Sequence, residues 1–449
     1  AGTDLGGGQK CVFNGNGNSV SVTNLTPNTV YHVRVFEYNG SGESQNYNTT
    51  TSTDNPSSRT TLASQPASAA SSIQFSNITQ TSFDLNFTNG DGSSRLVVLK
   101  QGSAVDSNPV DGSVYTANAT FGNGSQLGTG NYVVGIGSGP FSISGLTGDV
   151  TYHVAVYEFN GTGGAENYRI TGAPTASRQT SPTLQATDIV FSNLNTTTYT
   201  VSWTNAVDGS GGGSRRLVLA HLGAPVDANP AELTSYTPNA AFGSGTQIGT
   251  GNFVVFDGTG SSVNMTGLIA NNVYHFRVYE YNGANTSSAS YNTATATDNP
   301  NSRTTLESEP TTSSTSIVFS ATSQTQTTLT WMSGNGARRV VVAKAGSAVD
   351  SNPVDGTGYS ANNVFGTGTQ LGTGNFVVYD GTGNSETVTG LSSGTTYHFR
   401  IYDYNGTGAT SNYRTTTGSN NPNNVTTLVA VTSLLTAGAS AEPATVSSL

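Results

Sequence analysis

Apolar and polar residues alternate with a period of two along most of this chain. The pattern is clear in residues 83–87, Phe-Asp-Leu-Asn-Phe, and in residues 199–203, Tyr-Thr-Val-Ser-Trp. A strand directs successive side chains to opposite faces, so this alternation is typical of β-strands with one buried face. No stretch sustains the period of about 3.6 residues that marks an amphipathic helix. The sequence therefore predicts an all-β fold.

The segment from residue 184 to residue 306 indicates how many strands one region holds. Turns rich in glycine, asparagine and aspartate separate its apolar runs. The runs predict strands at 188–191, 199–203, 215–221, 252–256, 262–265 and 274–281. Because each strand must bury one face and protect its edges, we expect two stacked antiparallel sheets.

One short phrase recurs four times and divides the chain. Tyr31, Tyr152, Tyr274 and Tyr397 are each followed by histidine, at intervals of 121, 122 and 123 residues. This period is too long for a solenoid unit of roughly 20–50 residues, so each copy is expected to fold as a domain with its own core. The short joints contain proline among serine, threonine and alanine, which predicts limited bending between neighbours.

The repeat predicts five segments. They are an N-terminal partial unit at 1–62, a first full unit at 63–183, a second full unit at 184–306, a third full unit at 307–428, and a linker with the start of the next repeat at 429–449. Both ends interrupt a repeat, so we expect a longer protein.

The residues around the recurring tyrosine resemble those of the fibronectin type III family. A leucine stands six residues before each tyrosine, and alternating apolar residues follow it. In that family the tyrosine hydroxyl bonds back to the preceding turn, forming a tyrosine corner. The resemblance implies immunoglobulin-like β-sandwiches with structural corner tyrosines at Tyr31, Tyr152, Tyr274 and Tyr397. It also implies a core aromatic residue on the second strand, matched by Phe87, Trp203 and Trp331.

Each full unit is about 30 residues longer than the roughly 100 residues of a usual sandwich. The excess follows the third strand and begins with a recurring phrase, at 104–109, 224–230 and 348–353, that ends in Asn-Pro. Together with the Tyr-Glu-Tyr-Asn-Gly phrase, this insertion resembles repeats of very long cell-surface adhesins of gliding Bacteroidota, exported by the type IX secretion system. That resemblance implies an extracellular place on a bacterial cell surface.

Aromatic residues gather on the face of the sixth strand that lies opposite the corner tyrosine. The candidates are Tyr157, Phe159, Tyr279, Tyr281, Tyr402 and Tyr404. An exposed row of this kind can hold sugar rings or a partner protein. Alternatively the insertion covers it, which the length of the insertion favours, because a long insertion needs buried contacts of its own.

Charge and cysteine content remove several classes of function. Only 9% of residues are charged, the net charge is -10, and the 16 basic residues are dispersed, so nucleic acid is not an expected partner. The one cysteine, Cys11, excludes an intrachain disulfide framework and reads as a small buried hydrophobic residue. No apolar run approaches the roughly 20 residues that cross a bilayer.

The insertion of each full unit carries a pair of acids with an asparagine between them. The pairs are Asp106 with Asp111, Asp227 with Glu232, and Asp350 with Asp355. Oxygen ligands in a loop suit calcium, but two carboxylates fall short of the usual six to eight oxygens. Aspartate and asparagine before proline also cap turns, which is the alternative interpretation. No other cofactor is indicated.

No catalytic constellation emerges from the chain. Four of the five histidines occupy one repeat position, and His221 replaces a lysine of the sister repeats. The Gly-rich phrases lack the spacing and the following helix of a phosphate loop. We therefore expect a non-catalytic region.

The expected function is an extended stalk or filament of a cell-surface adhesin, serving gliding motility or surface attachment. Its partners would be neighbouring repeats and an external polysaccharide or protein that the sequence does not identify. The alternative is a set of spacer modules in a large secreted enzyme whose catalytic domain lies outside these residues.

Overall fold

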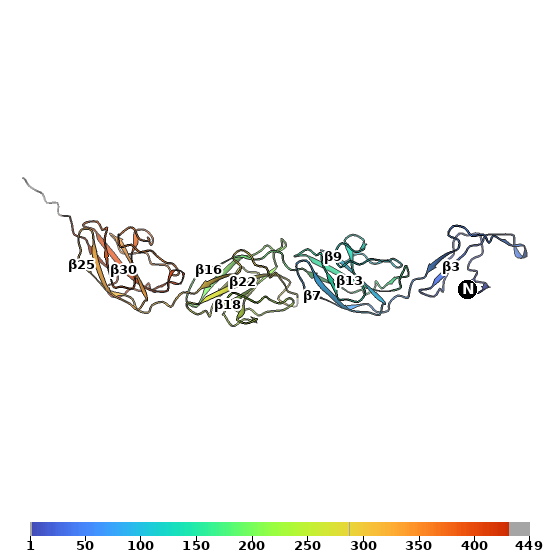
Figure 1. Cartoon of the computed structure of the whole chain (residues 1–449), viewed down its shortest axis with the longest axis horizontal. Helices are drawn as coiled ribbons and strands as arrows, with labels where there is room; N and C mark the ends of the chain where they lie inside the picture. Colours follow the sequence, from blue (N-terminus) through green and yellow to red (C-terminus); the bar gives the residue numbers. More distant parts are fainter. Residues whose placement is uncertain (1, 287, 431–449) are drawn as a thin grey trace, which may run out of the picture.

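Three β-sandwiches follow one another along an extended chain in the computed structural model, which describes residues 2–286 and 288–430. Figure 1 shows the sandwiches in line, with the N-terminal partial unit at one end. The predicted all-β array of antiparallel sandwiches, each with an insertion after its third strand, is confirmed. Of the expected linker and start of the next repeat at 429–449, residues 431–449 lie outside the described residues.

The second full unit consists of a small sheet packed on a large one. The small sheet has the order β16-β17-β21, and the large sheet has the order β19-β20-β18-β22-β23, with β24 also paired to β22. Its strands are β16 (Thr187–Ser192), β17 (Tyr199–Thr204), β18 (Arg215–Leu222), β19 (Gln247–Ile248), β20 (Asn252–Gly258), β21 (Ser262–Met265), β22 (Val273–Asn282), β23 (Ser290–Tyr291) and β24 (Asn301–Thr304). The central pair, β18 and β22, is antiparallel from Arg215 opposite Tyr281 to Leu222 opposite Tyr274.

The other two full units repeat this arrangement. The first has sheets β12-β8-β7 and β10-β11-β9-β13-β14 with β15 beside β13, and the third has β25-β26-β29 and β28-β27-β30-β31 with β32 beside β30. The first unit's strands are β7 (Ser71–Ser76), β8 (Phe83–Thr88), β9 (Ser94–Gln101), β10 (Gln126–Leu127), β11 (Asn131–Ile136), β12 (Phe141–Ile143), β13 (Thr151–Asn160), β14 (Asn167–Tyr168) and β15 (Thr175–Gln179). The third unit contains β25 (Thr315–Ser320), β26 (Thr327–Met332), β27 (Arg338–Ala345), β28 (Asn375–Gly381), β29 (Ser385–Val388), β30 (Thr396–Asn405), the 3-10 turn η2 (Gly408–Thr410), β31 (Asn412–Tyr413) and β32 (Asn423–Thr426).

The N-terminal partial unit holds three small antiparallel pairs rather than a closed sandwich. They are β1 (Asp4–Gly6) with β2 (Gln9–Lys10), β3 (Val30–Val33) with β6 (Ser57–Thr60), and β4 (Tyr38–Asn39) with β5 (Asn46–Tyr47), and a 3-10 turn, η1 (Gly42–Ser44), precedes β5. Its apolar side chains have little to pack against, and Val33 and Val35 remain exposed. Cys11, expected to be buried, is therefore only half-buried, and its thiol donates to the carbonyl of Phe13 at 3.3 Å.

Each full unit buries both faces of its large sheet. In the second full unit one core lies between the sheets and includes Val201, Trp203 and Phe276. A separate cluster on the other face includes Leu217, Tyr279 and, from the insertion, Tyr236. The first and third full units have the same two clusters. The unit is therefore three layers deep: small sheet, large sheet and insertion.

Candidate functional site on the covered sheet and at the joints

The recurring tyrosines bond back to the turn that precedes their strand. The hydroxyls of Tyr152, Tyr274 and Tyr397 accept backbone N–H groups five residues earlier, at 2.8, 2.9 and 2.9 Å. All three side chains are buried. Tyr31 accepts the corresponding bond from Thr26 at 2.9 Å but is only half-buried, because the partial unit lacks the opposing sheet. These contacts give the four tyrosines a structural role.

The aromatic residues on the second strand lie in the core between the sheets. Phe87, Trp203 and Trp331 are 8%, 5% and 4% exposed. Trp203 packs edge-on against Phe256, and its indole N–H donates to Asn205 at 2.8 Å. The indole N–H of Trp331, by contrast, has no hydrogen-bond partner among the described residues. Burial in the core means that this position offers no exposed ring to a ligand.

The aromatic row on the sixth strand lies beneath the insertion. Its six side chains are at most 7% exposed: Tyr157, Phe159, Tyr279, Tyr281, Tyr402 and Tyr404. The Tyr279 hydroxyl donates to the carbonyl of Ala228 at 3.0 Å, in the recurring Asn-Pro phrase of the insertion. Burial raises the pKa of Tyr279 to about 12, so the ring stays neutral. The structure therefore places this row in a second core.

A signal for this second core was present in the sequence. The third strand carries four consecutive apolar residues in each full unit, at 96–99, 217–220 and 340–343, and all of them are buried. A strand that alternates buries one face, whereas a continuous apolar run is typical of a strand buried on both. The insertion supplies the second cover.

The acid pairs of the insertion are divided between two structural roles. The first acids, Asp106, Asp227 and Asp350, accept side-chain N–H groups of Asn131, Asn252 and Asn375 at 2.8, 2.7 and 2.8 Å. The second acids, Asp111, Glu232 and Asp355, accept the backbone N–H groups of Tyr168, Tyr291 and Tyr413 at 2.8, 2.9 and 2.7 Å. Each acid thus fastens the insertion to a different strand. In residues 2–286 and 288–430 no cluster of three or more histidine, cysteine or acidic side chains could hold a metal.

A buried ion pair that sequence reasoning missed recurs in every full unit. Arg95 pairs with Glu158 at 2.9 Å, Arg216 with Glu280 at 2.9 Å, and Arg339 with Asp403 at 3.1 Å. The Glu280 carboxylate also accepts the backbone N–H of Gly213 at 3.1 Å. The acid therefore connects the loop after the second strand to the large sheet. In the sequence, the ion pair was indicated only by an arginine at the second position of each third strand.

An asparagine at the end of the sixth strand holds the segment that leads into each full unit, and Asn282 in this way reaches the preceding unit. The side chains of Asn160, Asn282 and Asn405 donate to linker carbonyls of Ser64, Thr180 and Ser308 at 2.8, 3.0 and 2.7 Å. This asparagine is the fourth residue of the Tyr-Glu-Tyr-Asn-Gly phrase. The phrase that pointed to a family therefore also fixes the joints.

The joint between the first and second full units has additional bonds. Gly211, in a loop that is longer than its counterpart in the first unit, accepts the backbone N–H groups of Thr183 and Leu184 at 2.8 and 2.6 Å. Its own N–H donates to Asp149 of the first unit at 3.1 Å. Arg178, 9% exposed, donates across the joint to Ala289 at 3.4 Å.

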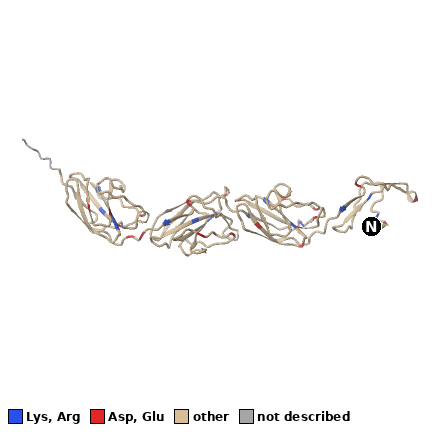
Figure 2. Ribbon diagram, in the orientation of Figure 1, with Lys and Arg blue, Asp and Glu red and all other residues tan. Residues whose placement is uncertain are grey.

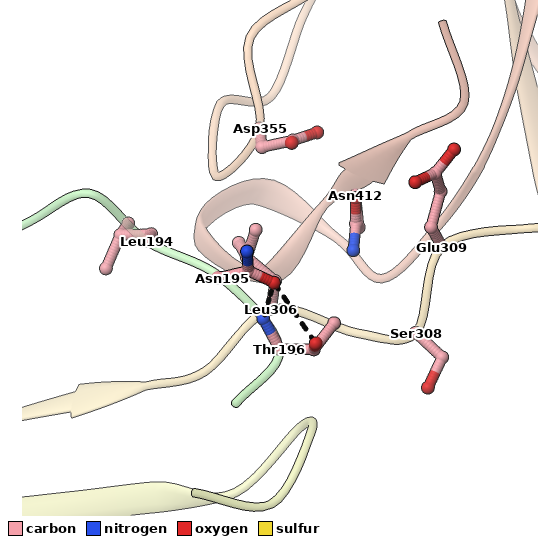
Figure 3. Close-up of a pocket in the computed structure, with 8 residues that line it drawn as sticks. All are labelled: Leu194, Asn195, Thr196, Leu306, Ser308, Glu309, Asp355 and Asn412. Carbon is pink, nitrogen blue, oxygen red and sulfur yellow. Dashed lines mark hydrogen bonds between the residues drawn. The ribbon is translucent and has the colours of Figure 1, made fainter. Parts of the chain in front are cut away.

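The joint between the second and third full units encloses a cleft of about 290 Å³. Figure 3 shows residues of both units around it: Leu194, Asn195, Thr196, Leu306, Ser308, Glu309, Asp355 and Asn412. Asp355 already holds Tyr413, and Glu309 pairs with Arg414 at 3.6 Å. Both carboxylates of this cleft are thus engaged within the third full unit.

Charged side chains do not collect on one face of the described ribbon. Figure 2 shows lysine and arginine scattered along the three sandwiches with aspartate and glutamate among them. None of the described helices is long and apolar enough to cross a membrane. The geometry thus identifies covered cores and fastened joints as the features that every full unit shares.

No family model matches this chain, and no curated protein matches it. Among solved structures, it is similar to the FN1–FN3 domains of chicken CNTN1, with 11% identity and a TM-score of 0.32 over 81% of this chain and 99% of that chain. It is also similar to a two-domain fibronectin type III segment of chicken tenascin, with 15% identity and a TM-score of 0.20 over 52% of this chain and all of that chain. Likenesses this low carry no argument about function.

Proposed function

We propose that this chain is a non-catalytic, extracellular repeat region that forms an extended stalk or filament of a bacterial cell-surface adhesin. The observation that carries the proposal is the asparagine that fastens each full unit to the linker before it. Such a bond holds the entering segment of all three full units, and Asn282 binds Thr180 of the preceding unit, which supports an array in which one unit follows another along an axis. Such an array holds a contact surface away from the cell.

The surface composition agrees with an extracellular stalk. Serine, threonine, asparagine and glycine supply most of the polar positions, and only 9% of residues are charged. Exposed ion pairs are weakened by salt, whereas packed cores are not. An array that relies on two apolar cores in each unit keeps its stability in media of changing ionic strength.

A specific relationship follows from the repeat phrases. We propose that the segments 1–62, 63–183, 184–306, 307–428 and 429–449 are successive parts of a giant adhesin related to the gliding-motility adhesin SprB and exported by the type IX secretion system. The Asn-Pro phrase of the insertion and the Tyr-Glu-Tyr-Asn-Gly phrase support this relationship. In that setting the stalk serves gliding motility or surface attachment.

Immunogold electron microscopy of the producing cells tests the proposal. Antibodies raised against the 449-residue chain are expected to label thin projections that extend from the cell surface. Antibodies against a cytoplasmic protein of the same cells are the control and should label intact cells only at background. Label confined to the cell interior, or found only in the medium, would contradict a surface stalk.

A further inference from the structure

A cleft of about 280 Å³ opens beside the large sheet of the third full unit. The loop that lines one side of it also contacts the preceding unit, because Arg303 donates to the carbonyl of Ala409 at 3.1 Å. Its lining comes from the four adjacent strands β28, β27, β30 and β31, from the insertion and from the loop after β30. The lining includes Arg338, Asp380, Tyr404, Tyr359, Gly408 and Ser411. Two of these are charged and two are aromatic, which makes the cleft polar with aromatic walls.

The charged residues form a network that retains free hydrogen-bonding capacity. Arg338 donates from Nε to the Tyr404 hydroxyl at 2.8 Å, and that hydroxyl donates to Asp380 Oδ1 at 2.7 Å. Arg338 Nη2 also lies 3.1 Å from Asp380 Oδ1. The side chains of Arg338 and Asp380 remain 37% and 20% exposed. Asp380 Oδ2 and the remaining guanidinium N–H groups are therefore available to a ligand.

A second observation at the cleft is an unpartnered buried hydroxyl. Ser411 is 1% exposed, lines the cleft, and its Oγ has no hydrogen-bond partner among the described residues. An unmade hydrogen bond at a buried hydroxyl costs roughly 1–3 kcal/mol. The wall of the cleft therefore contains a hydroxyl whose hydrogen-bonding capacity the described residues do not use.

The second full unit fills the corresponding place with its own side chain. It has the same network, from Arg215, Asp257 and Tyr281. There the carboxamide of Asn285 accepts the backbone N–H of Tyr236 at 2.8 Å and donates to the carbonyl of the same residue at 2.5 Å. The side chain of Asn285, with a donor beside an acceptor, thus satisfies both the N–H and the carbonyl of Tyr236.

The third full unit lacks that side chain. Tyr359 corresponds to Tyr236, because both hydroxyls accept a backbone N–H five residues earlier, at 2.8 Å in each case. Gly408 stands two residues after Gly406, as Asn285 stands two residues after Gly283. The N–H and carbonyl of Tyr359 therefore have no asparagine side chain to bond, and an external group can take its place.

We propose that this cleft binds a neutral sugar residue. Adjacent hydroxyls of a sugar offer the paired donor and acceptor that Asn285 offers, so they suit the backbone of Tyr359, while other hydroxyls bond Arg338 and Asp380. The charges of Arg338 and Asp380 already pair with each other, so the charge of an ionic ligand would find no partner in the cleft. Tyr359, half-buried, presents part of its ring for packing against the apolar face of a sugar. The volume lies just below the about 300–1,000 Å³ of small-molecule sites, which suits a single sugar residue.

Sugar binding is a function separate from the proposed stalk role, and the site is formed by the third full unit alone. The first full unit provides an internal comparison, because Ser94, Ile136 and Phe159 occupy the positions of Arg338, Asp380 and Tyr404. It lacks the charged network, so it is expected not to bind.

Saturation-transfer NMR on the whole chain tests the proposal, with D-glucose, D-galactose, D-mannose and N-acetyl-D-glucosamine as probes. The test variant is Gly408→Asn, which restores an asparagine to the cleft. A Cβ atom added there meets no atom within 4 Å, and φ is +52°, a conformation that asparagine tolerates better than most residues. Gly163→Asn, at φ +66° and with the same open space, is the matched control in the first unit.

We expect transfer to at least one sugar with the unaltered chain and with Gly163→Asn, and binding at least about tenfold weaker with Gly408→Asn. A second variant, Asp380→Asn, keeps the shape of the side chain and should weaken the same sugar while circular dichroism is unchanged. Transfer to none of the four sugars overturns the proposal. So does equal binding by Gly408→Asn and Gly163→Asn, whether both retain or both lose the sugar. Surface labelling of cells has no bearing on either result.

Discussion

At the scale of single residues, buried asparagine side chains connect backbone segments that are distant in the sequence. Asn299 illustrates this: its side chain accepts the N–H of Val278 at 3.0 Å and donates to the carbonyls of Val278 and Ala186 at 2.9 and 2.8 Å. The bonds connect the sixth strand to the backbone just before the first. Buried amide groups with every bond made add specificity at little cost, because no polar atom is left unsatisfied.

One half-buried carboxylate makes the second full unit sensitive to pH. Burial raises the pKa of Glu232 to about 7 from 4.5, although the N–H of Tyr291 and the nearby Arg178 both lower it. One of its oxygens has no partner among the described residues. The folded state therefore favours the protonated acid.

The direction of the resulting pH dependence follows from linkage. An acid with a raised folded pKa contributes stability that is complete below its unfolded pKa and is lost as pH rises through the folded value. The melting temperature of the second unit is thus expected to fall between about pH 4.5 and 7. Differential scanning calorimetry of the chain and of Glu232→Gln measures this, and the variant should lose that part of the dependence. An unchanged profile in the variant would contradict the assignment.

At the scale of elements, the strands were predictable wherever their pattern alternates. The runs at 199–203 and 262–265 correspond to β17 and β21 within one residue. The last strand, β24, escaped prediction because its sequence, Asn-Ser-Arg-Thr, has no apolar alternation and pairs only at the edge of β22. The tyrosine-corner geometry followed from a local phrase, whereas the buried ion pairs depend on contacts more than 60 residues apart.

The cover formed by the insertion makes a prediction for Tyr279. Tyr279→Ala removes a fully buried ring and its bond to Ala228, so it should lower the free energy of unfolding by about 3–5 kcal/mol. Chemical denaturation followed by tryptophan fluorescence measures the change, since Trp203 lies in the other core of the same unit. Val190→Ala is the control in the same unit, because Val190 is 55% exposed, and it should cost less than about 1 kcal/mol. Equal effects of the two substitutions would mean that the insertion does not form a core.

At the scale of the whole molecule, the asparagine bonds make the joints part of the fold. The joint between the first and second full units is fastened more heavily than the other two, because the Gly211 loop and Arg178 add bonds across it. The sequence predicted restricted joints from their length and proline content. It could not reveal these bonds, since Asp149 and Asn282, which meet at 2.9 Å, are 133 residues apart.

Small-angle X-ray scattering of the 449-residue chain tests the lengthwise array most directly. A ten-residue strand such as β22 spans roughly 33 Å, so three full units in line exceed about 100 Å. We expect a maximum dimension beyond that length and the scattering of a rod of constant cross-section. A radius of gyration near 22 Å, about the value for one compact domain of this size, would contradict the account.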